Sequence, residues 1–302
     1  MPNFLVVGAG KSGTTSIFHY LKQHPDIYVP ENKEPRFFVS SKFEQFNPKD
    51  PLYNYFNKSI SFSIENYSKL FNKVTHESAI GEASVQYLYY YDTAIPQIKK
   101  FLGDIKIIMI LRNPVERAFS AYVHLLRDGF ESLPFEKCLE IEEEKIKANW
   151  DTLHFCKNAG FYYKQVKAYL ENFNHVKVYL YDDLEKEPLH LVSDLCQFLG
   201  VDPSFVPNNV KVKFNISGIP QVKSLQSFLV KYDHPLKRPL RPLFLNTIGR
   251  KNTEILVNYF RKKNLRKPKI KPETKKYLID LYKEDILLLQ ELINRDLSSW
   301  LK

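Results

Sequence analysis

The stretch FLVVGAGKSGTTS, residues 4–16, decides the fold class of this 302-residue chain. Residues 3–8 are apolar and partly β-branched, which predicts a short strand, and from Gly13 to Gln23 the apolar residues recur at helical spacing. Glycine, lysine and hydroxyl side chains fill the turn between them. Because backbone amides at a helix N-terminus attract anions, this strand–loop–helix unit is predicted to bind a phosphate or sulfate group.

The turn looks like the P-loop of nucleotide-binding proteins but departs from it at one position. The Walker pattern has a glycine five residues before its Gly-Lys pair, and that position is Leu5. A second apolar strand, Ile105–Leu111, runs into Arg112, where a Walker enzyme would often have an aspartate for Mg²⁺. Arg112 and Ser120, about two helical turns on, suit a second phosphate group held without a metal. Taken alone, Arg112 is equally well explained as a helix-capping or surface ion-pair residue.

Strands and helices alternate along the chain. Helices are predicted from Pro114 to near Gly129 and over 161–173, a strand over 176–181, and a helix over 189–199 that ends at Gly200. A C-terminal helix over 272–292 carries an apolar stripe of Leu278, Leu281, Tyr282, Leu288, Leu289 and Leu292. The pattern indicates an α/β, P-loop-type three-layer fold with a central parallel sheet between helices and a helical C-terminal end. We expect one domain over residues 1–302, with the proline-rich, basic stretch 206–250 as a loop-rich cover.

Composition limits the class of protein. Hydrophobic residues at 44% and charged residues at 26% are ordinary for a soluble globular protein. Cys138, Cys156 and Cys196 show no CxxC spacing and are predicted to be free, buried thiols in a reducing compartment. There is no basic leader and no apolar run of about 18 residues, so we expect a cytoplasmic protein without a membrane span.

Positive charge is concentrated in one block. The net charge is +10, and residues 236–276 contain fourteen Lys and Arg against Glu254 and Glu273. Such a block suits a nucleic acid, a membrane surface or the attraction of an anionic substrate, and a solvated face without a partner is as good an explanation.

Four segments together resemble the PAPS-dependent sulfotransferases, where PAPS is 3′-phosphoadenylyl sulfate. They are KSGTTS at 11–16, ILRNPVERAFSAYVH at 110–124, GFYYKQVKAYL at 160–170 with YDDLEKEP at 181–188, and RDLSSWL at 295–301. The branch most resembled contains the heparan sulfate sulfotransferases and bacterial relatives, and the resemblance covers nearly the whole chain. It implies PAPS as donor cosubstrate and no metal.

The resemblance also implies roles for individual residues. It assigns the 5′-phosphosulfate to Lys11, Ser12, Gly13, Thr14, Thr15 and Ser16. It assigns the 3′-phosphate to Arg112 and Ser120, and the nucleotide pocket to Tyr162, with Tyr163 as the competing assignment. A looser match places Ser217, Gly218 and Lys223 in a loop that closes over the nucleotide.

The catalytic base implied by the resemblance is Glu34. The segment KEPRFF at 33–38 resembles the family's E-x-x-F-F motif, whose glutamate takes the proton of the acceptor hydroxyl. Glu82 is a second-choice acid or base near the acceptor, and Arg36 an acceptor-side residue. Arg36 stands where the branch often has histidine, and the aspartate that often follows the two phenylalanines is absent. These departures bear on the identity of the acceptor and not on that of the donor.

The function predicted from the sequence is therefore in-line transfer of a sulfuryl group from PAPS to an acceptor hydroxyl. A carbohydrate acceptor, including an anionic saccharide, is the leading expectation, while lipids, polyketides and small alcohols stay open as acceptors. No nucleic-acid partner is expected. The alternatives are a nucleotide kinase or NTPase that uses the P-loop, and an anionic-polymer-binding protein that uses the 236–276 block. The oligomeric state is not indicated by the sequence.

Overall fold

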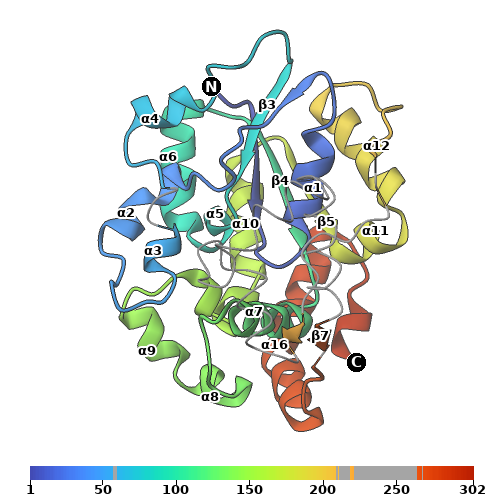
Figure 1. Ribbon diagram of the computed structural model, residues 1–302. Helices are drawn as coiled ribbons and strands as arrows, with labels where there is room; N and C mark the ends of the chain where they lie inside the picture. The colour runs from blue at the N-terminus through green and yellow to red at the C-terminus, as the bar shows by residue number, and fades with distance from the viewer. Residues whose placement is uncertain (57–59, 209, 211–217, 221–263, 267) are drawn as a thin grey trace, which may run out of the picture.

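A parallel five-stranded sheet with the strand order β2-β3-β1-β4-β5 forms the centre of the molecule (Figure 1). The computed structural model describes residues 1–56, 60–208, 210, 218–220, 264–266 and 268–302. The strands are β1 (Phe4–Gly8), β2 (Ile27–Tyr28), β3 (Ala79–Ala83), β4 (Lys106–Leu111) and β5 (Val176–Leu180). Since all four neighbouring pairs are parallel, the carboxyl ends of the strands lie at one edge of the sheet.

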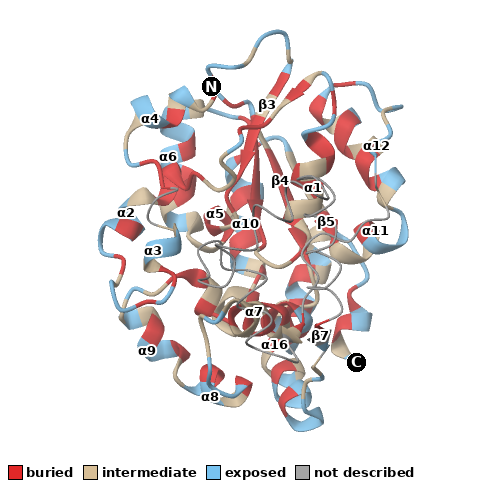
Figure 2. Cartoon of the chain, viewed as in Figure 1, coloured by how far each residue is buried: buried red, intermediate tan, exposed pale blue. Residues whose placement is uncertain are grey.

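Helices cover both faces of this sheet because successive strand residues point to opposite sides. Leu5 and Val7 of β1 join one buried cluster, whereas Phe4 and Val6 join the other. The first cluster includes residues of α5 (Gln86–Tyr89), α6 (Tyr91–Leu102), α7 (Pro114–Asp128), α10 (Tyr163–Asn172) and α16 (Pro272–Ile293). The second includes residues of α1 (Thr14–Leu21), α11 (Tyr181–Lys186) and α12 (Pro188–Leu199). Figure 2 shows the buried sheet between the two helical layers.

Shorter elements connect these layers. They are η1 (Phe37–Val39), α2 (Ser40–Glu44), α3 (Tyr53–Phe56), α4 (Ile64–Lys69), α8 (Phe135–Glu140), α9 (Glu142–Lys147), η2 (Thr152–His154), η3 (Asn158–Gly160), the antiparallel pair β6 (Ile219–Pro220) and β7 (Leu265–Arg266), and η4 (Ser298–Leu301). Most lie between β2 and β3 or between α7 and α10.

Local chemistry fixes the helix that follows β4. The Asn113 side chain accepts hydrogen bonds from the amides of Val115 and Glu116, and Pro114 occupies the first turn. Gly129 ends α7 with φ at 79°, a conformation that glycine adopts without a steric penalty. α7 therefore starts directly at the carboxyl edge of the sheet and runs below it.

The three-layer fold and each long element predicted from the sequence are confirmed, with local corrections. Tyr181, predicted as the end of a strand, begins α11. Leu288, predicted in the buried stripe of the C-terminal helix, is exposed, and Ile286 is buried in its place. The three cysteines are buried and free. Most of the predicted cover segment 206–250 lies outside the described residues, and the single-domain assignment stays a prediction.

Replacing Gly81 by alanine tests the packing of β3 against β1. A Cβ atom there would overlap the Phe4 ring, so we expect overpacking of about 1–3 kcal/mol and a Tm lower by about 2–5 °C. Adding Phe4→Leu removes the ring, so the double variant should cost less than the sum of the single variants in a thermal-unfolding cycle. Strict additivity would contradict the predicted contact.

Candidate active site

Loops at the carboxyl edge of the sheet surround one large cavity. It has a volume of about 1750 Å³ and is lined by residues that follow β1, β3, β4 and β5. β3 pairs with one edge of β1, and β4, the next strand along the chain, pairs with the other edge. The cavity opens at this point, where the order of the strands reverses, and ligands usually bind at such a position. Typical small-molecule pockets measure roughly 300–1,000 Å³, so this cavity has room for a nucleotide and a second substrate.

The loop between β1 and α1 forms one wall of the cavity. Gly13 has φ at 96°, and a Cβ atom there would lie 2.6 Å from Leu184, so the position requires glycine on both counts. Thr14, Thr15 and Ser16 line the cavity at the start of α1. Ser12 lies behind the wall, and its buried Oγ has no hydrogen-bond partner of normal geometry among the described residues. An anion entering the loop would meet hydroxyls and the positive end of a helix.

Lys11 lies in this cavity, and three of the other cationic side chains that line it act on its charge: Lys33, Arg112 and Arg127. Burial within the cavity lowers the pKa of Lys11 to about 7. The positive charges of Arg127, Arg112 and Lys33 act in the same direction, and Asp128 only partly opposes them. Like charges brought together in this way favour a bound anion, which would restore the ordinary pKa of the lysine.

Arg112 lies over the Tyr181 ring, 4.4 Å from its centroid, and points into the cavity. Its Nε and Nη2 donate to Glu116 Oε2 at 3.1 and 2.9 Å, and its Nη1 donates to the Lys11 carbonyl at 3.5 Å. The i,i+4 pair with Glu116 fits the alternative of a surface ion pair. The approach to Lys11 fits the alternative of anion binding, since it joins the two predicted phosphate-binding elements in one place.

One face of α7 adds residues that the sequence reasoning overlooked. Ser120 lines the cavity, and His124, Arg127 and Asp128 follow it on the same helical face. Arg127 donates from Nε and Nη2 to Asp128 at 2.8 Å, and its Nη2 lies 2.6 Å from His124 Nδ1. Burial, together with the charges of Lys11 and Arg127, lowers the pKa of His124 to about 3, so the imidazole is neutral. The i, i+4, i+7 spacing from Ser120 would have indicated this face.

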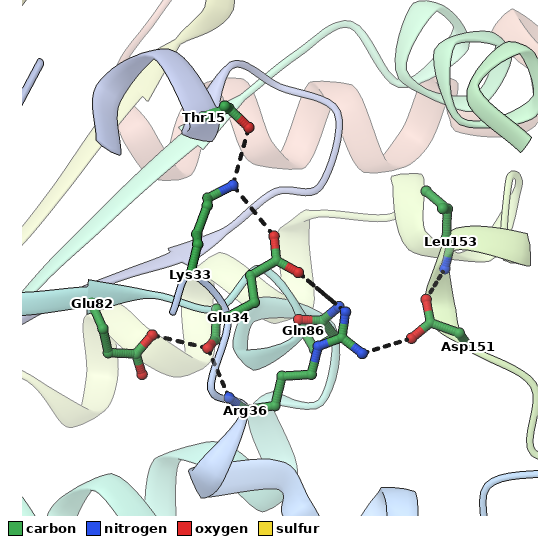
Figure 3. Close-up of polar contacts among 9 residues, drawn as sticks. Thr15, Lys33, Glu34, Arg36, Glu82, Gln86, Asp151 and Leu153 are labelled. Atoms are coloured by element: carbon green, nitrogen blue, oxygen red, sulfur yellow. Dashed lines mark hydrogen bonds and ion pairs between the residues drawn. The ribbon is translucent and has the colours of Figure 1, made fainter. Parts of the chain in front are cut away.

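Glu34 lies next to the anion loop (Figure 3). The Lys33 ammonium bridges the two, 3.0 Å from Thr15 Oγ1 and 3.4 Å from Glu34 Oε1, and Arg36 Nη2 donates to Glu34 Oε2 at 3.1 Å. Burial would raise the pKa of Glu34, but the charges of Lys33 and Arg36 and their hydrogen bonds outweigh it and hold the pKa below its ordinary value. The carboxyl is therefore ionised at neutral pH.

Glu82 lies behind the cavity wall. Its side chain is fully buried and accepts from Ser84 Oγ at 2.9 Å and Tyr67 Oη at 3.3 Å. Burial raises its pKa to about 7. The position differs from the acceptor-side location expected from the sequence, since no Glu82 atom faces the cavity among the described lining residues.

The remaining candidates are placed as follows. Tyr162 is buried, and the Tyr162 and Tyr163 amides donate to Asp285 of α16, which fixes the start of α10. The Tyr162 hydroxyl, like Ser12 Oγ, has no partner of normal geometry within the described part of the chain. Gly218 is buried. Ser217 and Lys223 lie outside the described residues, as does most of the 236–276 block.

The described ranges contain neither a metal site nor a helix that could span a membrane. No group of three or more His, Cys, Asp and Glu side chains there is arranged to hold a metal ion. No helix in the same ranges has the length and apolar character needed to cross a bilayer.

Comparisons with known proteins place this fold and site in a family. A model of the sulfotransferase family matches residues 2–205. The crystal structure of a sulfotransferase from Alicyclobacillus acidocaldarius is 33% identical and covers 100% of this chain and 99% of its own, with a TM-score of 0.74. The chain belongs to the sulfotransferase family, which confirms the family and the enzyme class predicted from the sequence. The kinase, NTPase and polymer-binding alternatives find no support in these matches.

Curated relatives extend the comparison. The membrane-associated sulfotransferase kil1 of Dictyostelium discoideum is 36% identical over 125 residues, which is 40% of this chain and 22% of that protein. The bifunctional heparan sulfate N-deacetylase/N-sulfotransferase 3 of Mus musculus is 27% identical over 210 residues, 68% of this chain and 23% of that protein. The chain thus spans about a quarter or less of the length of these two relatives.

The lowered pKa of Lys11 gives a pH test of the anion site with inorganic sulfate, which does not titrate near neutrality. The protonated ammonium favours the anion, so affinity should be highest below about pH 7 and fall above it, by up to about tenfold per pH unit. Isothermal titration from about pH 6 to about pH 9 measures this. Lys11→Met should bind weakly and without the pH dependence, whereas Lys137→Met, at an exposed position of α8, should behave as wild type. A pH dependence that survives in Lys11→Met would contradict the assignment.

Proposed function

We propose that the protein transfers a sulfuryl group from PAPS to an acceptor hydroxyl. One observation carries the proposal: the Lys33 ammonium contacts both Thr15 of the anion loop and the Glu34 carboxylate. A group that binds anions and a group that accepts a proton therefore lie side by side in one cavity. In-line transfer requires both groups within one cavity, because the base must reach the attacking hydroxyl while the leaving nucleotide is held on the opposite side of the sulfur.

The donor half of the site consists of the β1–α1 loop and the start of α7. Lys11 and the hydroxyls of Thr14, Thr15 and Ser16, which line the cavity, would bind the 5′-phosphosulfate. Arg112 and Ser120 would bind the 3′-phosphate. The residues therefore fit PAPS, which supplies the activated sulfuryl group. As the S–O bond to the nucleotide breaks, its electron pair goes to the phosphate oxygen, and Lys11 stabilises the charge that develops there.

The acceptor half contains Glu34 as the base. Its carboxylate takes the hydroxyl proton while the acceptor oxygen forms the new bond to sulfur, giving the sulfate ester and PAP, the 3′,5′-bisphosphate. The charges of Lys33 and Arg36 hold the pKa of Glu34 below its ordinary value. A negatively charged donor beside it would raise that pKa and make the carboxylate a stronger base just when it is needed.

A carbohydrate is the acceptor class we propose, in keeping with the heparan sulfate and carbohydrate sulfotransferases among the relatives. Aromatic side chains line the same cavity as Glu34, including Tyr55, Phe56 and Tyr89, and such rings stack on sugar faces. The cytoplasmic location predicted from the sequence stays a prediction.

Glu34→Gln tests the base directly. The amide keeps the shape of the side chain but cannot take a proton, so sulfuryl transfer should fall by at least about a hundredfold while PAP affinity stays near wild type. Transfer of radiolabelled sulfate and calorimetric binding of PAP measure the two properties. Retained transfer, or loss of PAP binding instead, would contradict the assigned role.

Glu116→Gln tests the proposed 3′-phosphate site. Glu116 occupies two donors of Arg112, so the phosphate must displace it, and its removal should tighten PAP binding about two- to fivefold. Adenosine 5′-monophosphate lacks the 3′-phosphate and should bind both proteins almost equally. Weaker PAP binding by the variant would mean that Glu116 instead holds Arg112 in place.

A further inference from the structure

The turn that carries Glu34 has a strained backbone. Glu34 and Arg36 have φ values of 66° and 54°, in the left-handed region that non-glycine residues seldom adopt. Pro35 lies between them and restricts the turn further. The Arg36 amide donates to Ser84 Oγ at 3.1 Å, and the Ser61 amide donates to the Pro35 carbonyl at 2.8 Å. Such a conformation persists only where its surroundings enforce it, which points to a requirement on the direction of these two side chains.

The Arg36 side chain is the centre of those surroundings. It is 0% exposed, and its guanidinium lies 3.7 Å from the centroid of the Phe56 ring. Nη2 donates to Glu34 Oε2 at 3.1 Å, and Nη1 donates to Asp151 Oδ2 at 3.3 Å (Figure 3). The Gln86 amide is oriented so that its oxygen, and not its NH₂ group, faces the guanidinium of Arg36. This oxygen accepts from Nε at 3.2 Å and from Nη2 at 2.8 Å. A buried charge with this set of partners is fixed in direction.

Asp151 is itself held at a fixed point. Its Oδ1 accepts from the Leu153 amide at 2.9 Å, and its own amide donates to Asp50 Oδ2 at 2.7 Å. Asp50 Oδ1 lies 3.1 Å from His154 Nε2, and both of these side chains are buried. A continuous chain of contacts therefore runs from the 3₁₀ turn η2 through Asp151 and Arg36 to the Glu34 carboxylate.

We propose that Arg36 and Asp151 form a positioning pair that orients the Glu34 carboxylate toward the reacting hydroxyl. This inference rests on the proposed function, since it assigns the orientation of its base. Arg36 holds Oε2 of Glu34, which leaves Oε1 on the side of Lys33 and the anion loop. Asp151 fixes the other edge of the same guanidinium and compensates its charge. Arg36 is then a positioning residue and not the acceptor-binding residue expected from the sequence.

The charges around Glu34 allow orientation to be separated from electrostatics. Lys33 and Arg36 lower the pKa of Glu34, while Glu82 on β3, His124 on α7 and Asp151 also face this region. Activity requires the ionised carboxylate, so it falls as the pH drops through the pKa of Glu34. Removing the Arg36 charge raises that pKa and moves the acid limb of the pH–rate profile to higher pH.

The double variant Arg36→Met/Asp151→Asn tests the pair, because removing both charges avoids leaving one buried without a partner. We expect kcat to fall by about a hundredfold, the acid limb of kcat/KM to move to higher pH, and the affinity for PAP to stay within about threefold of wild type. As a matched control, Lys145→Met/Glu131→Gln removes another buried pair, 2.7 Å apart and outside the cavity lining. The control should alter thermal stability without moving the acid limb.

Arg36→Lys keeps the positive charge but loses the planar guanidinium that contacts Glu34 and Asp151 at once. This variant decides the question if the double variant does not fold. It should leave the acid limb near its wild-type position and still lower kcat. Wild-type kcat in Arg36→Lys, or an unchanged kcat and acid limb in a folded double variant, would overturn the positioning role. Glu34→Gln separates the two proposals: if it remains active, the base assignment fails, whereas an inactive Glu34→Gln beside fully active Arg36 variants removes only the inference about the pair.

Discussion

The cavity at the carboxyl edge of the sheet brings Lys11 close to three of the other cationic side chains that line it, and this local excess of positive charge sets the conditions for the rest of the site. Lys11, Lys33, Arg112 and Arg127 come from three different places in the chain, and the parallel sheet brings them together because its strands end at one edge. Their mutual repulsion helps to lower the pKa of Lys11 to about 7. Three of the four already have a carboxylate neighbour, yet Lys11 is left with charges that favour an anion.

Two glutamates near the cavity illustrate how environment separates roles. Glu34 faces cationic neighbours, and its pKa lies below the ordinary value. Glu82 lies behind it among hydroxyl groups, where burial raises its pKa to about 7. Only the first borders the cavity, so only the first fits the role of base in the proposed reaction. The second is better explained as an anchor of the wall, since it binds Ser84, whose hydroxyl in turn accepts from the Arg36 amide.

Sequence reasoning reached the residues of the proposed donor half more readily than those around the proposed base. The β1–α1 loop, Arg112 and Ser120 could be found because local spacing ties them to a strand end and a helix start. Lys33 and the His124 and Arg127 positions also lay within reach of local patterns that were not used. No local pattern could have indicated Asp151, because it lies in an aperiodic turn 115 positions beyond Arg36 along the chain. Only tertiary packing brings the two residues together. The short helices between β2 and β3 were likewise beyond periodicity, since each has one or two turns.

The most direct test of the central claim is to incubate the purified protein with PAPS that carries a radiolabelled sulfuryl group and a panel of glycan, lipid and small-alcohol acceptors. The account predicts that label appears on a hydroxyl-bearing acceptor, with one PAP released for each label transferred, and that a glycan is the best acceptor. Absence of transfer to every acceptor, together with hydrolysis of Mg-ATP by the same preparation, would contradict the account. The loop between β1 and α1 would then be better explained as the P-loop of an NTPase.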